Sequence, residues 1–543
     1  MRSILLLGAA MGLMSLGAPQ ARPFDVLALS ALCSNEAQGS AGVRPAAATM
    51  KILPGYGNDS LAISTGNPQA QAWFNHGLRL AWAFAHEEAT AAFREAVRLD
   101  PACGMCLWGE ALSLGPTINY PINAQQKAEA YAVAVRAQKL LASSPERDRR
   151  LGSALIQRYR LGGGAYARAM ETLARGYPQD DSLQVLAADA LMIAGQEKRA
   201  VEILDAVLRR SPDSAGAIHF YIHSTEWIGQ AGRAEAHADR LKALAPGASH
   251  LIHMPSHTYY QIGRYRDAAM ANLEAMDVDH AWVKTTGASA SPWDIPYYGH
   301  NVRFALGGAM MAGEAGAALK IAGRYLETPE KDIKAGGIWA QTGVASAWFA
   351  HGRFTDPDQV MAMAPPSPDL PLVRALWRYG RGEALARKGD ADLLLAEVRL
   401  MKPGVEGRGP PSGSATALIE IGRGVLAGRA AMLQSDFGVA AKAYRAAAIR
   451  QERALGDQRD PPPWWYPVRR SLAAALLADS RYEPALQEAR SVLKTWPRDP
   501  MALLVVSRAQ AALGRRVEAE EALAAARSGW GAGDIAVTPL TLI

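Results

Sequence analysis

The sequence predicts an all-α protein, a right-handed α-solenoid built from helix–turn–helix repeats. Two observations predict this fold. Proline recurs every 34 residues at Pro178, Pro212 and Pro246, and a fixed period of this length is typical of repeat proteins. Alanine and leucine, which are good helix formers, dominate a chain that shows no sustained alternation of apolar and polar residues. The repeat-bearing length divided by this period predicts about ten to twelve helix pairs.

Two further residue types keep the same register as the prolines. Glycine and alanine recur at the same interval, as Gly195, Gly229 and Gly263 and as Ala200, Ala234 and Ala268. We expect each glycine to end the first helix of a pair, where the chain turns tightly. The small alanines let the second helix approach its neighbour, and proline separates one pair from the next.

The first unit carries the markers of a known repeat. They are, in order, Trp73, Gly77, Ala89, Phe93, Ala96 and Pro101. In this pattern the chain resembles the tetratricopeptide-repeat (TPR) family over most of residues 67–530. The resemblance implies the fold and says little about function, because such arrays mostly bind other molecules.

Four segments resemble, more narrowly, a group of exported bacterial TPR proteins that has no settled activity. They are Phe74–Ala89, Leu99–Gly115, Ala217–Glu226 and His250–Tyr259. This resemblance implies that the four segments form one functional unit, but it supplies no reaction.

The repeat register divides the chain into six parts. They are a signal peptide (1–21), an N-terminal extension (22–66), a TPR-like array with a histidine-lined groove (67–363), Pro/Gly-rich breaks with an irregular repeat (364–414), a C-terminal TPR-like array (415–530) and a tail (531–543). Gly115–Ala124 and Val283–Tyr298 interrupt the repeat, and such insertions become loops, often on the binding face. The segment Arg459–Pro467 is interpreted as a hydrophobic plug, with an aromatic ligand platform as the alternative.

Residues 1–21 have the pattern of a secretory signal. Arg2 precedes a short apolar stretch, and Ala18 and Ala21 offer cleavage points. The stretch is short for a membrane span, and we expect no integral membrane segment after cleavage. The expected location is the periplasm or outside the cell; the alternative is an amphipathic or buried N-terminal helix.

Charge and cysteine content limit the function classes. The net charge of +6 comes from 58 basic and 52 acidic residues that are scattered along the chain. A nucleic-acid binder would concentrate its cations, so we expect no nucleic-acid partner. Cys103 and Cys106 are expected to form a disulfide in an oxidising compartment, with metal binding and redox catalysis as weaker alternatives.

Histidines form the most specific pattern in the chain. His219 and His223 are four residues apart, as are His253 and His257, and the second pair follows the first by one repeat. Each pair therefore shares one helix face, and the pairs occupy equivalent sites on the first helices of adjacent units.

Three more residues extend the same stripe, which in the TPR family faces the concave groove. They are His250 and His300, each at the second position of its unit, and Glu226, one turn after His223. Three or four ligands about 2.0–2.2 Å from one ion make a metal site, and first helices about 8–10 Å apart let imidazoles share one. The stripe predicts a site for copper, zinc or iron, with affinity that falls as the pH drops through about 6.5.

A second hypothesis requires no metal. The groove could hold a peptide, a protein or a small molecule, with the histidines as polar contacts, so the chain would be a periplasmic binding scaffold. Lone histidine pairs on a helix are usually unconnected with metal, and the chain lacks the HExxH pattern of zinc proteases. Catalytic residues, if there are any, are not identified by the sequence.

Overall fold

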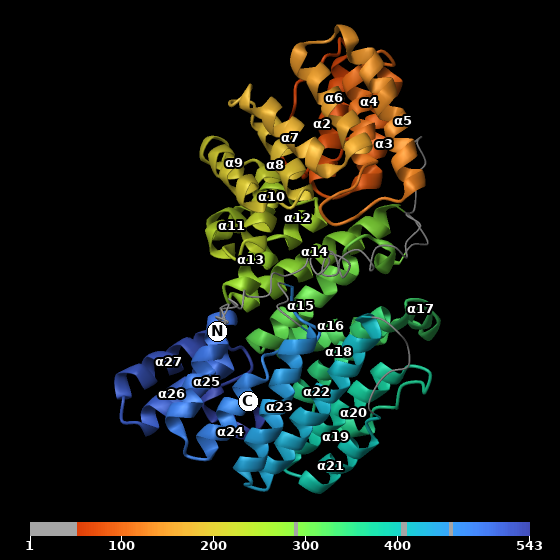
Figure 1. The fold of residues 1–543 in the computed structure, drawn as a ribbon. Coiled ribbons are helices and arrows are strands. Elements are labelled where there is room, and N and C mark those ends of the chain that lie inside the picture. The colour runs from red at the N-terminus through yellow and green to blue at the C-terminus, as the bar shows by residue number, and fades with distance from the viewer. Residues whose placement is uncertain (1–50, 287–290, 403–409, 456–459) are drawn as a thin grey trace, which may run out of the picture.

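The structure is a computed structural model that describes residues 51–286, 291–402, 410–455 and 460–543. The predicted signal at 1–21 lies outside these residues. The regular structure of the described residues is helical, without a β-strand, and successive helices pack as antiparallel neighbours (Figure 1). The predicted all-α solenoid of helix–turn–helix repeats is therefore confirmed.

What we call the N-terminal part runs from α2 to α16. Its helices are α2 (Pro68–Trp82), α3 (His86–Leu99), α4 (Gly104–Ser113), α5 (Ala124–Leu140), α6 (Glu146–Leu161), α7 (Gly163–Arg175), α8 (Asp181–Ile193), α9 (Glu197–Arg210), α10 (Ala215–Trp227), α11 (Glu235–Leu244), α12 (Ser249–His253), α13 (Pro255–Gln261), α14 (Tyr265–Thr286), α15 (Tyr298–Ala312) and α16 (Ala315–Leu326).

The C-terminal part continues from α17 to the end of the chain. Its helices are α17 (Glu330–Ala335), α18 (Gly337–Phe354), α19 (Pro357–Ala362), α20 (Pro371–Lys388), α21 (Ala391–Leu400), α22 (Pro410–Leu433), α23 (Phe437–Leu455), α24 (Arg469–Ala478), α25 (Tyr482–Thr495), α26 (Pro500–Ala512) and α27 (Arg516–Ser528). In Figure 1 the helices at the end of the chain, drawn in blue, lie near α15.

The repeat markers have the structural roles that their chemistry suggests. Gly195, Gly229 and Gly263 have φ angles of 71°, 71° and 82°, and they end the first helices of three successive pairs. This left-handed conformation is open to glycine at little cost. Ala200, Ala234 and Ala268 are fully buried, where their small side chains allow close helix packing.

One predicted helix is interrupted. The first helix of the unit that begins at Ser249 is split into α12 and α13, and Pro255 is the first residue of the second piece. Proline has no amide hydrogen, and its ring clashes with the preceding turn. The break separates His253 from His257 without moving them to different faces, because their Nε2 atoms lie 3.0 Å apart.

An extended segment, residues 51–66, lies along the starts of several inner helices. Asp59 accepts hydrogen bonds from Ser214 Oγ at 2.5 Å and from the Gly216 amide at 3.1 Å, at the start of α10. The Gly247 amide donates to the Gly55 carbonyl at 2.8 Å, just before α12. The segment thus fixes the ends of helices that carry the histidines.

The C-terminal part contains the predicted plug. Trp464 and Tyr466 are fully buried, and the Trp464 ring packs against Phe349 and Tyr379 with centroids 5.1 Å away from each. The interpretation of this segment as a hydrophobic plug is therefore confirmed.

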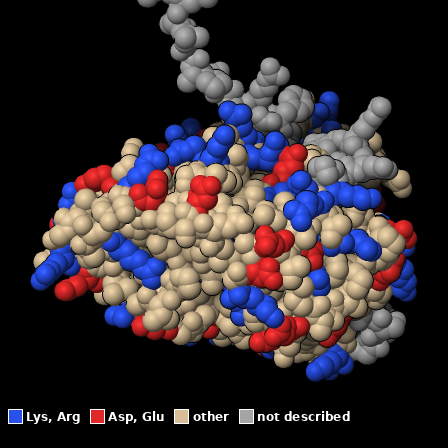
Figure 2. Space-filling model, turned by 90° about the horizontal axis from the view of Figure 1, so that it is seen from below, with Lys and Arg blue, Asp and Glu red and all other residues tan. Residues whose placement is uncertain are grey.

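Three further observations bear on the predictions. Cys103 and Cys106 form a disulfide at the start of α4, as predicted. In the described residues no helix is long and apolar enough to cross a membrane. Figure 2 shows basic and acidic side chains interspersed over the face in view, in keeping with the scattered charges of the sequence.

Candidate metal centre

Six histidines meet in the interior of the N-terminal part. They come from α10, α12, α13 and α15, and they are His219, His223, His250, His253, His257 and His300. The rings form a continuous set of contacts, in which the centroids of His219 and His250 are 4.9 Å apart and those of His253 and His300 are 4.7 Å apart. The spacing of 34 residues therefore does bring the two predicted pairs together.

The cluster is closed, whereas the sequence suggested an open groove. No histidine in it is more than 6% exposed, and His219 and His253 are fully buried. Three elements that are remote in sequence cover the stripe: the α2–α3 turn, the insertion before α15 and the segment that begins at Asp460. The predicted histidine-lined groove is therefore covered, and these side chains do not face solvent.

Two of the covering residues have unusual backbone conformations. Phe84 and Tyr297 have φ angles of 57° and 69°, a region that non-glycine residues seldom adopt. The ring centroid of Phe84 lies 4.4 Å from that of His219 and 4.8 Å from that of His250. The ring centroid of Tyr297 lies 4.6 Å from that of His250. Such conformations cost about 1–3 kcal/mol and concentrate at functional sites, so the structure holds these two rings against the cluster at some cost.

The first triad consists of His219, His223 and His250, whose ligand atoms lie within 4.8 Å of one another. His219 Nδ1 is 2.5 Å from the Trp82 carbonyl oxygen. A carbonyl only accepts, so this nitrogen carries the proton, and the Nε2 atom of a neutral His219 ring has a free lone pair. That atom lies 3.2 Å from His250 Nε2.

His223 differs from its neighbours because both of its ring nitrogens are buried without any hydrogen-bond partner. The Nδ1 atom of His250 is also buried and unpaired. Each unsatisfied buried polar group costs about 1–3 kcal/mol, and such groups are rare enough that each needs an explanation, an unseen ion among them. Three such nitrogens occur together in the first triad.

The second triad consists of His253, His257 and His300, which also lie within 4.8 Å of one another. His253 Nδ1 is 2.6 Å from Asn272 Oδ1, whose amide nitrogen donates to the Ala268 carbonyl. His257 Nδ1 is 3.1 Å from the Glu226 carboxylate. Both Nδ1 atoms therefore carry protons, and the two Nε2 atoms face each other at 3.0 Å.

This contact requires a positive centre between the two nitrogens. Two bare lone pairs at 3.0 Å repel each other, so either a proton or a metal ion must lie between them. Metal-binding histidines almost always donate their other N–H to a carboxylate or a carbonyl, which fixes the tautomer. His219, His253 and His257 all have this outer hydrogen bond.

Two carboxylates lie beside the second triad. Glu226 contacts His257, as described, and Asp460 lies 3.7 Å from both His257 Nδ1 and His300 Nδ1. Arg303 forms a 2.7 Å ion pair with Asp460 and also approaches His300 Nδ1 at 3.2 Å. Since arginine only donates, a neutral His300 ring carries its proton on Nε2 and must release it to bind metal through that atom.

Burial controls the protonation of most of the cluster. It lowers the pKa of His219 to about 3, and it lowers the pKa values of His223, His250, His253 and His300 well below the usual 6.5. These rings are therefore neutral, as metal ligands must be. At these histidines the predicted loss of metal affinity therefore occurs at a pH below 6.5.

His257 is the exception. Burial alone would lower its pKa, but the charge and hydrogen bond of Glu226, helped by Asp460, outweigh burial and raise the pKa above 6.5. In the metal-free protein a proton on His257 Nε2 therefore satisfies the contact with His253. A metal ion at this place has to displace that proton.

Several functional contacts were missed by sequence reasoning. Asn272, Arg303 and Asp460 carry no local signal, and Asp460 lies far along the chain from the histidines that it contacts. The two insertions in the repeat were a partial indication of this covering layer. Asn119 in the first insertion donates a hydrogen bond to the Tyr297 hydroxyl in the second, at 3.2 Å. His86 stacks on Phe84, with ring centroids 5.3 Å apart, and is not a member of either triad.

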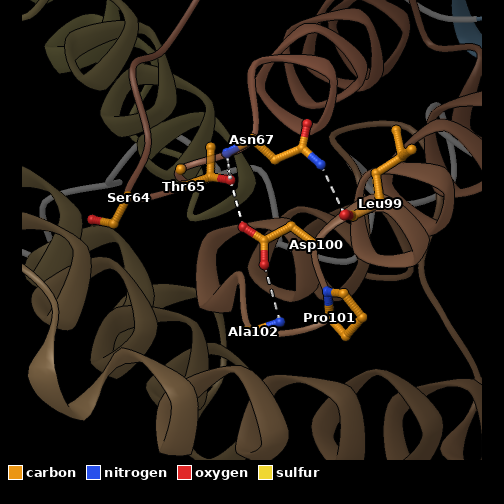
Figure 3. A pocket seen from close by; sticks show the side chains of 8 residues that line it. Ser64, Thr65, Asn67, Leu99, Asp100, Pro101 and Ala102 are labelled. Atoms are coloured by element: carbon orange, nitrogen blue, oxygen red, sulfur yellow. Dashed lines mark hydrogen bonds between the residues drawn. The ribbon is translucent and has the colours of Figure 1, made fainter.

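A separate surface hollow of about 670 Å³ lies between residues 64–67 and the α3–α4 loop (Figure 3). Its polar groups bond mainly to one another: Thr65 Oγ1 donates to Asp100 at 2.5 Å, and Asn67 Nδ2 donates to the Leu99 carbonyl at 2.9 Å. None of the clustered histidines lines it. The hollow therefore contributes nothing to the metal centre.

Comparison with known proteins assigns neither a family nor a function to this chain. No protein-family model and no curated protein matches the sequence. Similar solved structures include the Naa15/Naa10 complex bound to HypK-THB, at 13% identity and a TM-score of 0.23, covering 87% of this chain and 90% of that one. Another is the human IFIT1 dimer with m7Gppp-AAAA, at 11% identity, a TM-score of 0.31, and 93% and 95% coverage. Likeness at these TM-scores carries no argument about the fold or the function.

Proposed function

We propose that this protein binds a transition metal (copper, zinc or iron) in its buried histidine cluster, on a TPR-like scaffold. The observation that carries the proposal is the orientation of the imidazoles. Outer acceptors hold the Nδ1 protons of His219, His253 and His257, so their Nε2 atoms are directed at neighbouring histidines. This is the outer arrangement that metal-binding histidines need.

The chemistry of the ligands narrows the choice of ion. Neutral imidazole suits zinc, copper, iron and nickel, whereas carboxylate and carbonyl oxygens suit magnesium and calcium. Three imidazoles leave one position open on a tetrahedral ion, which is the pattern of catalytic zinc sites rather than of structural ones. The site is therefore able to bind a small substrate or water, and metal-dependent catalysis is part of the proposal.

Export to the periplasm or the cell exterior belongs to the same proposal. The support is the pattern of residues 1–21 together with the disulfide between Cys103 and Cys106. Mass spectrometry of protein from a fractionated bacterial host tests it. We expect a mature chain that begins near Arg22 outside the cytoplasm, and an intact Met1 found in cytosol alone would contradict export.

Elemental analysis tests the metal. Protein purified from the exported fraction without chelator should carry about one or two metal ions per chain. The double variant His223→Gln/His257→Gln should carry fewer, with its helical circular dichroism retained. His237→Gln is the matched control, since His237 is half-buried on α11 of the same unit and outside the cluster. Folded wild-type protein that stays metal-free after incubation with copper, zinc and iron would refute the proposal.

A specific observation also favours a peptide-binding role for the C-terminal part. Its inner helices hold the chain's own residues 536–543 by their main-chain carbonyls: Arg508 bonds to Ala536 and Thr538 at 2.7 and 2.8 Å, and Arg429 bonds to Thr541 at 2.5 Å. The bound segment contains two short 3₁₀ helices, Ile535–Val537 and Leu540–Leu542. Arginines that hold a segment by its main-chain carbonyls suit other peptides of similar conformation. Deletion of residues 531–543 should then allow a synthetic peptide of that sequence to bind, and no binding to the folded deletion variant would exclude this role.

A further inference from the structure

The six histidines divide into two sets of three. Within each triad the ligand atoms lie within 4.8 Å of one another. Ligands about 2.0–2.2 Å from one ion lie at most about 4.4 Å apart, so each triad needs only a small adjustment to enclose an ion. Six imidazoles are also more than one tetrahedral ion uses, since zinc sites take three or four protein ligands.

The two triads are adjacent and have separate supports. His223 of the first triad contacts His257 of the second, with ring centroids 5.3 Å apart, and His250 contacts His253 at 5.6 Å. The first triad is anchored by the Trp82 carbonyl and covered by Phe84. The second is anchored by Asn272 and Glu226. Each therefore has its own outer hydrogen bonds, as an independent site requires.

Neither triad is complete without a cation. In the second triad the Nε2 atoms of His253 and His257 face each other at 3.0 Å, and an ion bound by both would remove the repulsion between their lone pairs. In the first triad three buried ring nitrogens have no partner, both nitrogens of His223 and Nδ1 of His250. A single ion in the second triad would leave those nitrogens of the first triad unsatisfied.

We propose that the cluster is a dinuclear centre that holds two transition-metal ions, one in each triad. This inference rests on the proposed function. Paired metal ions close to each other act together on a shared oxygen ligand in many enzymes, and the closed walls restrict such a ligand to a few atoms, such as hydroxide or dioxygen. Glu226 and Asp460 add negative charge beside the second triad.

Copper(II) titration of the metal-free, full-length protein tests the inference. Equilibrium dialysis with elemental analysis should give two ions per wild-type chain. The variants His219→Gln/His250→Gln and His253→Gln/His300→Gln should each keep one ion, and His237→Gln should keep two. Electron paramagnetic resonance should show interacting spins in wild type and an isolated copper signal in each triad variant.

Other results would overturn the inference in distinguishable ways. One ion in wild type, lost entirely from both folded triad variants, would show a single shared site, and the proposed function would stand without the dinuclear centre. No ion in folded wild type would refute both. If a triad variant does not fold, the wild-type stoichiometry still decides between two ions and one.

Discussion

The N-terminal and C-terminal parts both bury polar side chains on their inner helices, but they satisfy them differently. In the C-terminal part the guanidinium of Arg470 is paired with Asp499 at 3.1 Å, and that of Arg429 with Glu383 at 3.3 Å. Some single donors there, such as Trp464 Nε1, have no acceptor, yet these buried charges are paired within the chain. In the N-terminal part, His223 has no partner for either nitrogen.

This difference distinguishes a polar core that is paired within the chain from the candidate binding site. Buried charges are tolerated when they are paired and hydrogen-bonded. Arg470 meets that condition through Nη1, which bonds to Asp499 without any ligand, although its Nε has no partner. Buried neutral polar groups likewise need hydrogen-bond partners. Both ring nitrogens of His223 in the first triad lack them. We therefore expect the C-terminal core to be insensitive to metal and to depend on its own pairs, whereas the histidine cluster depends on protons and metal.

Acid should produce the largest contrast between the two parts. Burial lowers the pKa values of five clustered histidines, so below pH 6.5 the folded state binds fewer protons than the unfolded chain. As the pH falls below 6.5, the free energy of unfolding therefore decreases by up to about 1.4 kcal/mol per pH unit for each such histidine. His257, whose pKa is raised, opposes this trend.

Denaturant unfolding of the metal-free protein between pH 7 and 5 measures the effect. His219→Gln/His253→Gln should weaken the pH dependence relative to wild type, because two of the groups that cause it are gone. An unchanged dependence would show that these histidines do not titrate as buried neutral groups.

Breaking the paired core should cost nearly as much. Asp499→Ala leaves Arg470 buried without its partner, and removal of one member of a buried pair costs about 3–5 kcal/mol. Asp499 also caps α26 by accepting from the amides of Met501 and Ala502, which adds about 1 kcal/mol. Chemical unfolding should show this loss equally with and without metal, and a loss that metal reverses would contradict the comparison.

Metal should stabilise only the N-terminal part. A ligand that binds the folded state alone adds about 2.7 kcal/mol at a hundredfold excess over its Kd. Hydrogen exchange of metal-loaded protein should therefore slow in α10, α12, α13 and α15, with little change in α22, α24 and α26. Uniform slowing in both parts, or none in either, would be inconsistent with a site confined to the histidines.

The smallest expected effect is a gain in stability. His223→Leu removes two unpaired buried nitrogens and fills a similar volume, so the metal-free variant should be about 1 kcal/mol more stable than wild type. The same variant should lose metal from the first triad. If thermal unfolding shows a clear loss of stability instead, His223 has a satisfied structural role and the unpaired nitrogens are not a mark of function.

Local pattern was enough to predict the helices and the meeting of the histidine pairs. The period of 34 residues and the four-residue spacing fix which helix face His219, His223, His253 and His257 occupy, and the structure brings these side chains together. Closure of the site was not predictable in this way. It depends on how far the array curves, which brings Asp460 against His257 and Phe84 against His250.

The outer hydrogen bonds of the histidines could not be predicted from the sequence either, because they depend on tertiary packing. The Trp82 carbonyl and Asn272 are acceptors whose partners are set by packing, and neither residue type marks a metal site by itself. Two aromatic residues with left-handed backbone, Phe84 and Tyr297, also give no signal in sequence. These positions carry the evidence that the cluster is a binding site.

Crystallography of the metal-loaded protein tests the central claim most directly. Anomalous difference maps collected at the absorption edge of the bound metal locate it without assumptions about the ligands. Our account predicts density inside the cluster, about 2.0–2.2 Å from nitrogens of His223 in the first triad and of His253 in the second. Density only at the surface, or an empty cluster in protein that carries metal by elemental analysis, would contradict it.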